Sequence, residues 1–79
     1  MDNNQRDTRK FLEEQLQWVI EQDNILKKIE INLYEMRSLA EYARDHELSS
    51  KEYNRLNYQI NELKNKVVVL QQQRETAVH

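Results

Sequence analysis

Apolar residues recur at helical spacing along most of the chain, in two stretches separated by a short polar break. The stretches cover residues 8–46 and 50–77, and spacings of three and four residues place side chains on one face of an α-helix. The pattern therefore predicts two helices with these bounds, joined by a turn at residues 47–49. Residues 1–7 are polar and aperiodic, so we expect them to be a disordered lead-in to a single helical unit.

The second stretch has the more regular pattern. Its apolar residues follow alternating steps of three and four, as in a coiled-coil seam: they are Tyr53, Leu56, Ile60, Leu63, Val67 and Leu70. The first stretch offers two heptad columns to match this seam. One column holds Leu12, Val19, Leu26, Leu33 and Ala40, and the other holds Gln15, Gln22, Ile29, Met36 and Ala43. A third, largely apolar column adds Phe11, Trp18, Ile25, Asn32 and Leu39. The first helix therefore carries a stripe wider than one partner helix requires.

A helix-start signal in the middle of the chain indicates that the chain reverses there. Segment 49–52 fits the S-x-x-E capping box, in which the Ser49 hydroxyl accepts an N–H and Glu52 reaches back. Leu48 precedes the cap, in a position to pack on Tyr53 one turn inside the helix. A helix that starts here implies that the preceding helix has just ended. The alternative is one continuous rod with the serines on its surface.

Folded antiparallel about this turn, the two helices bring matched residues together. The expected pairs are Ala43 with Tyr53, Ala40 with Leu56, Met36 with Ile60, Leu33 with Leu63, Ile29 with Val67, and Leu26 with Leu70. Small residues face large ones beside the turn, and residues of similar size face each other farther away. We therefore predict an all-α fold, a coiled-coil-like antiparallel two-helix hairpin.

The first helix is longer than the second, so its beginning would extend past the hairpin. At 1.5 Å per residue the two helices would measure roughly 58 Å and 40 Å. The surface then left without a partner holds Phe11, Leu12, Leu16, Trp18, Ile25 and Leu39. Soluble monomers rarely expose such a patch, so we expect a homodimer, most simply an antiparallel four-helix bundle. Gln15 and Gln22 would lie inside or beside its interface, where buried polar pairs can fix register.

Composition and charge narrow the function. The 79 residues include no glycine, proline or cysteine, which excludes a glycine-rich phosphate loop, a disulfide framework and a cysteine zinc site. Twelve basic and fourteen acidic residues give a net charge of −2, too near neutral to indicate nucleic-acid binding. No apolar run approaches the about 20 residues of a membrane span, and the start lacks the apolar core of a signal peptide. We expect a cytoplasmic protein with no nucleic-acid, membrane or small-molecule partner.

Side chains that carry chemistry elsewhere are scattered here. His46 lies at the end of the first helix, where the helix dipole favours a cation, and no second histidine lies near enough to share a metal. Acidic pairs such as Glu13 and Glu14 fall on columns that face water. No serine or cysteine can be matched with a base. We therefore expect no catalytic residue, no metal site and no cofactor, and hence no enzyme.

One resemblance to a known family concerns the middle of the chain. The residues that carry it are Leu33, Tyr34, Glu35, Met36, Leu39 and Ala40 in the first helix, Leu48, Ser49 and Ser50 at the turn, and Leu56 in the second helix. In outline they are similar to short helical hairpins that dephosphorylate a sporulation response regulator in bacilli. The resemblance implies a phosphatase-like regulator. That family carries S-Q-E-L-D where this chain has Asn, Tyr, Gln, Ile and Asn at residues 57–61, so the acidic motif is replaced and such a protein would be inactive.

The residues themselves favour a non-enzymatic protein–protein interaction module, acting as an adaptor, a regulator or a scaffold. Two interpretations of its apolar surface stay open. The surface is either the core of a homodimer or a docking site for a helix of another protein, with Phe11 and Trp18 as anchors. A purely structural oligomerisation unit is the third possibility.

Overall fold

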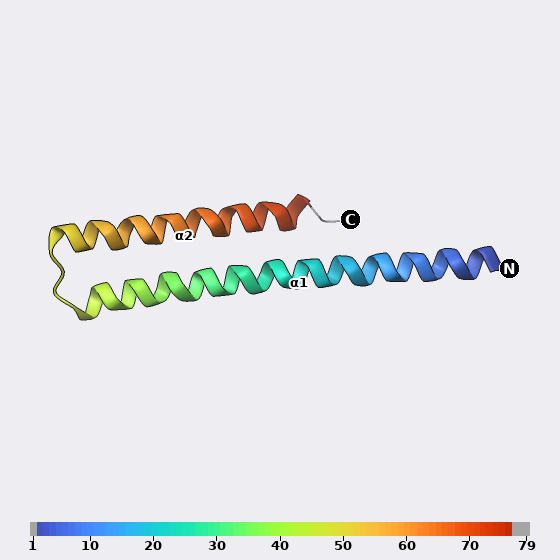
Figure 1. Cartoon of the computed structure of the whole chain (residues 1–79), viewed down its shortest axis with the longest axis horizontal. Helices are drawn as coiled ribbons and strands as arrows, with labels where there is room; N and C mark the ends of the chain where they lie inside the picture. Colours follow the sequence, from blue (N-terminus) through green and yellow to red (C-terminus); the bar gives the residue numbers. More distant parts are fainter. Residues whose placement is uncertain (1, 77–79) are drawn as a thin grey trace.

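The computed structural model describes the backbone of residues 2–76 and the side chains of residues 4–75. It contains two helices, α1 (Asp2–Asp45, 44 residues) and α2 (Ser50–Thr76, 27 residues). They lie side by side and antiparallel (Figure 1), in an arrangement measuring 71 × 19 × 11 Å. The expected all-helical hairpin is confirmed, and the continuous rod is excluded. Ala77, the expected last residue of the second helix, lies outside the described residues.

The structure corrects the expected start of the first helix. We expected a disordered lead-in over residues 1–7, but α1 already begins at Asp2. Local interactions explain the difference, because this stretch contains no helix-breaking glycine or proline. The Thr8 hydroxyl donates to the Asn4 carbonyl at 2.8 Å, and Arg9 forms a 3.2 Å ion pair with Glu13 one turn later. Absence of apolar periodicity therefore did not mean absence of a helix.

The first helix ends at Asp45, one residue earlier than expected, and His46 closes it. Nδ1 of His46 lies 2.9 Å from the carbonyl oxygen of Tyr42. A carbonyl can only accept, so Nδ1 carries the proton and satisfies one of the free carbonyls at the helix end. The His46 ring also stacks on the Tyr42 ring, with centroids 4.0 Å apart and an interplanar angle of 18°. The histidine thus has a structural role at the turn.

Ser49 caps α2, as the S-x-x-E pattern predicted. The Glu52 backbone N–H donates to the Ser49 hydroxyl oxygen at 3.2 Å, and the Tyr53 N–H donates to the Ser49 carbonyl at 2.9 Å. The Ser49 hydroxyl in turn donates to the Glu52 carboxylate at 3.2 Å. The glutamate therefore reaches back to the serine side chain, whereas the usual capping box uses the serine backbone N–H.

A narrow seam between the helices forms the core. Ile29, Leu63 and Val67 are each 8% exposed. Around them, half-buried side chains extend the seam: Trp18, Ile25, Leu26, Asn32, Met36, Leu39 and Ala43 on α1, and Leu56, Ile60 and Leu70 on α2. Gln15, closer to the amino terminus of α1, is also half-buried. The expected seam of α2 is confirmed except at its first residue.

The α1 side of the expected pairing is partly wrong. Leu33, Ala40 and Tyr53 are exposed, although they were assigned to the seam. The column of Ile25 and Leu39 takes part in their place, beside the column of Ile29. Since α1 is apolar on three neighbouring columns, the direction from which α2 approaches decides which two are covered.

We predict that Ser49→Ala lowers the free energy of unfolding by about 1 kcal/mol, because α2 loses its N-cap. Thermal unfolding followed by circular dichroism at a fixed protein concentration measures the change. Ser50→Ala is the matched control, since it leaves the Ser49 hydroxyl in place. Equal stability of the two variants would contradict the capping role.

Candidate protein-interaction surface

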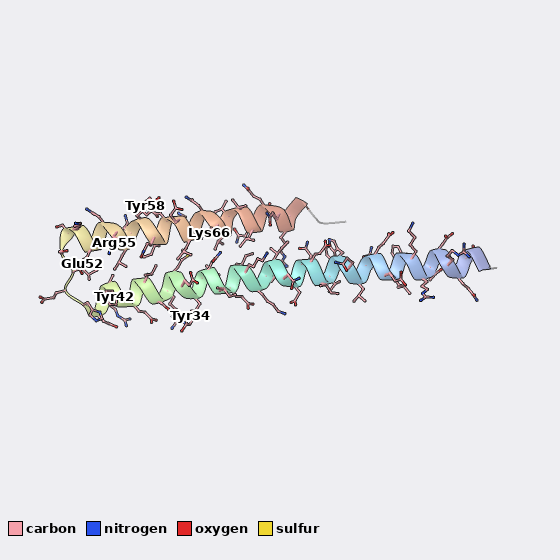
Figure 2. All side chains as sticks on the ribbon, in the orientation of Figure 1. Tyr34, Tyr42, Glu52, Arg55, Tyr58 and Lys66 are labelled. Atoms are coloured by element: carbon pink, nitrogen blue, oxygen red, sulfur yellow. The ribbon has the colours of Figure 1, made fainter. Side chains whose placement is uncertain are left out.

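Within residues 2–76, the first part of α1 has no helix alongside it. The end of α2 lies beside Trp18 and Gln22, which share one surface depression with Arg74. Toward the amino terminus, residues 2–17 of α1 extend alone (Figures 1 and 2). We call residues 2–17 the overhang. The expected difference in helix length therefore leaves about four turns of α1 without intramolecular cover.

The overhang carries three large apolar side chains that are exposed. Phe11, Leu12 and Leu16 are 58%, 60% and 61% exposed. Leu12 and Leu16 line a groove together with Thr8 and the stem of Arg9. These three apolar residues were expected to bind a partner, and the structure places them together on the uncovered helix.

The other three expected site residues lie elsewhere. Trp18 is half-buried at the end of α2, and its depression also includes Leu26. Ile25 and Leu39 were expected to lack partners within the hairpin, but both are half-buried on the α2 side of α1. That expectation was wrong, because α2 covers their column. The overhang and these inner residues therefore form two environments, not one surface.

The exposed apolar stripe of α1 changes character where α2 begins to cover the helix. Leu12, Val19, Leu26 and Leu33 follow one column, in which Leu26 is half-buried and the other three are exposed. In the neighbouring column Leu16 is followed, at intervals of seven, by charged residues: Asp23, Glu30 and Arg37, all exposed. Exposed apolar residues thus occupy both columns at Leu12 and Leu16, whereas along the hairpin the second column is charged.

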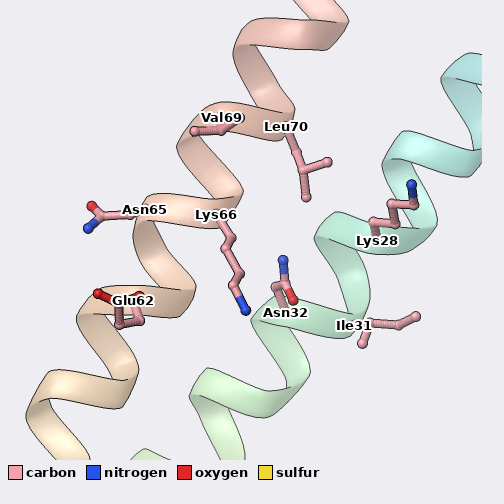
Figure 3. Close-up of a pocket in the computed structure, with 8 residues that line it drawn as sticks. All are labelled: Lys28, Ile31, Asn32, Glu62, Asn65, Lys66, Val69 and Leu70. Atoms are coloured by element: carbon pink, nitrogen blue, oxygen red, sulfur yellow. The ribbon is translucent and has the colours of Figure 1, made fainter.

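A second apolar depression lies on one flank of the hairpin (Figure 3). Ile31 of α1 and Val69 and Leu70 of α2 supply its apolar lining, and Lys28 and Lys66 lie at its edges. In Figure 3, Leu70 and Lys66 extend from α2 toward α1. The sequence analysis did not single out Ile31. Ile31 lies seven residues after Asn24 and seven residues before Ser38. Both of these residues are polar, so the heptad column that contains Ile31 does not look apolar in the sequence.

Gln22 is a polar residue in the core of the hairpin. It is only 8% exposed, and its side-chain nitrogen is buried without a hydrogen-bond partner. A buried donor left unpaired costs about 1–3 kcal/mol. We expected Gln22 inside or beside a dimer interface, but the fold encloses it between α1 and the end of α2.

The described residues contain no metal-binding cluster. No group of three or more His, Cys, Asp or Glu side chains among them is arranged to hold a metal ion. The Arg44 guanidinium donates to both carboxylate oxygens of Asp45, at 2.8 and 3.2 Å. This contact lowers the pKa of Asp45 and raises that of Arg44. Both side chains are exposed beside the turn, so the pair lacks the enclosed cleft in which a shifted pKa points to catalysis.

We predict that Gln22→Met stabilises the hairpin by about 1 kcal/mol, since methionine has a similar length and leaves no unpaired donor. Urea unfolding followed by circular dichroism gives the free-energy difference. Gln15→Met, at a half-buried position one heptad earlier, is the control and should change stability less. A loss of stability in the Gln22 variant would show that the amide has a partner in solution.

Comparisons with known proteins give no indication of the function, so the function has to be inferred from the surface of the structure. No protein-family model, curated protein or solved structure matches this chain. Within residues 2–76, neither helix combines the length and apolar character needed to cross a membrane. The exposed apolar side chains of α1 are therefore the feature on which a functional proposal can rest.

Proposed function

We propose that this protein is a non-enzymatic helical interaction module, which binds other proteins through the apolar surface of α1. The observation that carries the proposal is the exposure of Phe11, Leu12 and Leu16 on the overhang. Of the described side chains in the hairpin, few are as deeply buried as those of Ile29 and Val67. A large part of the chain's apolar surface is therefore not covered by α2.

The energetics favour a partner on this surface. Fully burying one Leu or Phe side chain contributes about 1.5–3 kcal/mol relative to leaving it in water. Leu12 and Leu16 are four residues apart, a spacing found among the anchor residues of helices that dock into grooves or pair with another helix. The helix is already formed, so binding does not have to order it, which lowers the entropic cost.

Homodimerisation is part of this proposal, and a helix of another protein is the second kind of partner. A four-helix bundle made of two hairpins would cover the stripe from Leu12 to Leu33. An adaptor, regulator or scaffold in the cytoplasm would use either kind of binding. The mass of the purified chain in solution separates a self-associating protein from one that waits for a different partner.

The phosphatase-like alternative lacks support from its expected motif. Segment 57–61 presents Asn57 and Asn61 on the exposed side of α2, and it contains no carboxylate. Incubation with phosphorylated response regulators tests this alternative directly. Faster loss of phosphate, abolished by Asn61→Ala, would replace our proposal with an enzymatic function.

We predict that Leu16→Asp removes binding of partner proteins without unfolding the hairpin, because Leu16 is exposed and lies outside the seam. Immobilised wild type and variant are compared for the proteins that they capture, and circular dichroism confirms the fold. Leu16 is a cleaner choice than Trp18, which is half-buried at the end of α2.

Tyr58→Asp is the control for this experiment. Tyr58 is 66% exposed and projects from the side of α2 that faces away from α1 (Figure 2). The Tyr58→Asp variant should capture the same partners as the wild type. Identical capture by wild type and Leu16→Asp would reject the overhang as the binding surface.

A further inference from the structure

We propose that α1 pairs with α1 of a second copy of this chain, antiparallel, along an exposed face between Asp23 and Arg44. The inference rests on the proposed function and specifies the face and the register of its homodimer. The two-fold axis passes between Leu33 and Tyr34, and the overhangs of both copies stay outside the interface. Each overhang therefore remains free to bind a different protein.

Three neighbouring heptad columns of α1 form this face, which we call the lateral face. The apolar column lies nearest to α2 and holds Leu26, Leu33 and Ala40. The charged column comes next and holds Asp23, Glu30, Arg37 and Arg44. The outer column holds Lys27, Tyr34 and Glu41. At 100° per residue, these columns lie about 40°, 100° and 140° around the helix from the column of Ile29. Leu26 and Glu41 are half-buried, and the other residues of the face are exposed.

The charged column is complementary to its own reverse. Along the chain it presents two acidic residues and then two basic residues, each one heptad apart. When two copies lie antiparallel about the axis, Asp23 faces Arg44 of the second copy, and Glu30 faces Arg37 of the second copy. Both contacts occur twice because of the symmetry. An isologous interface requires such a pattern, because the same patch has to be complementary to itself.

The outer column matches about the same axis. A two-fold axis perpendicular to the plane of the paired helices keeps each flank on its own side, so each column meets its own copy. Lys27 then comes beside Glu41 of the second copy. Tyr34 is 72% exposed, projects away from α2 (Figure 2) and meets Tyr34 of the second copy. The outer column thus adds one pair of opposite charges on each side of the axis and an aromatic contact beside it.

The apolar column supplies the hydrophobic part of the contact. Leu33, which is 48% exposed in the single chain, meets Leu33 of the second copy beside the axis. Leu26 comes beside Ala40 of the second copy, so a large side chain faces a small one on each side of the axis. Pairing therefore removes from water a leucine that α2 leaves exposed on the hairpin part of α1.

Ion pairs within each helix leave the charges accessible to a second copy. Asp23 and Lys27 form a 3.1 Å ion pair, and Arg37 and Glu41 form a 2.9 Å ion pair. The side chains of these four residues remain 45–79% exposed. In the dimer, Lys27 lies between Asp23 and Glu41 of the second copy. The two intrahelical pairs thus join into a network of alternating sign, in which charges contribute more than in isolated surface pairs.

Other arrangements of the same face bring like charges together. In a parallel pair, each residue of the charged column meets its own copy, so Glu30 faces Glu30 and Arg37 faces Arg37. An antiparallel pair shifted by one heptad places either Glu30 or Arg37 opposite its own copy at the axis. Like charges across an interface are unfavourable and select against these alternatives. The charge pattern therefore specifies both the orientation and the register.

α2 leaves room for this pairing. The charged column points about 100° away from the seam column of Ile29. With packed helices about 10 Å apart, the axis of the second α1 then lies about 15 Å from the axis of α2, beyond the distance of direct helix packing. In this register α1 of the second copy ends opposite Gln22, because α1 itself ends at Asp45. It therefore does not run along Trp18 or the overhang.

The interface is small and partly charged. Two single helices that overlap over residues 22–45 bury on the order of 1,000 Å² in total, at the low end for specific complexes. Charged side chains lose water when they pair, so the charges specify the arrangement more than they increase the affinity. We therefore expect a dissociation constant in the micromolar range.

Charge reversal beside the axis tests the pairing. Glu30→Arg sets two arginines against each other on both sides of the axis, and Arg37→Glu sets two glutamates against each other. Each variant should weaken self-association by about tenfold or more in sedimentation equilibrium. The double variant Glu30→Arg with Arg37→Glu restores opposite charges and should recover the dissociation constant of the wild type. Glu35→Arg, an exposed residue on the other flank of α1, is the matched control and should change nothing.

A distance measurement tests the register. The chain has no cysteine, so Gln17→Cys on the overhang provides a single attachment site for a nitroxide spin label. In the proposed dimer the two labels lie toward opposite ends, about 50 Å apart. They lie less than about 30 Å apart in a parallel pair or in a pair whose overhangs meet. Pulsed electron paramagnetic resonance resolves these distances at a protein concentration above the dissociation constant.

The outcomes separate this inference from the function on which it rests. About 50 Å together with recovery in the double variant supports the pairing along the lateral face. A distance below about 30 Å, failed recovery, or a monomer at all concentrations would overturn it. Partner capture lost in Leu16→Asp would in those cases still support the interaction module, because Leu16 lies outside this interface. Unchanged capture in that variant would instead reject the proposed function.

Discussion

α1 and α2 pack along one seam, and within the described residues no third element covers either flank of it. Ile29, Leu63 and Val67 lie at its centre and are the most enclosed apolar side chains of the chain. A helix in a two-helix hairpin can bury only the part of its surface that faces the other helix. Every further apolar column remains exposed to water unless another molecule covers it. The limited reach of this seam explains why large apolar side chains of α1 such as Leu12 and Leu16 stay exposed.

The features that the sequence predicted well are local or strictly periodic. Ser49 and Glu52 cap α2 through contacts three residues apart, so their meaning did not depend on the rest of the fold. The column from Leu56 to Leu70 is flanked by polar residues, which left one face for the seam. The early start of α1 at Asp2 was missed because periodicity reports burial, and a helix that buries nothing has no periodic signal. An intrahelical contact such as the ion pair between Arg9 and Glu13 stabilises it without a core.

The α1 side of the seam could not be chosen from the sequence. Leu33 and Leu39 are equally apolar, and they belong to columns on either side of Ile29. The exposed position of Leu33 and the half-buried position of Leu39 follow from the direction in which the turn delivers α2. Gln22 shows the same limit. Its sequence position suggested a register-fixing contact between copies, but the structure leaves its amide nitrogen enclosed and unpaired at the end of α2. Such departures from good packing depend on where the shorter helix stops.

α1 changes its environment at about Trp18, where the cover of α2 ends. Before that residue, Leu12 and Leu16 lie in two adjacent columns, and both are exposed. Beyond it, Asp23 replaces the apolar residue of one column, and α2 takes the other side of the helix. Charges close to the seam keep the hairpin from presenting a second broad apolar face, which limits association there. On the overhang, Arg9 and Glu13 line the same groove as Leu12 and Leu16. A helix that is amphipathic on two different sides along its length can therefore fold with one partner and bind another.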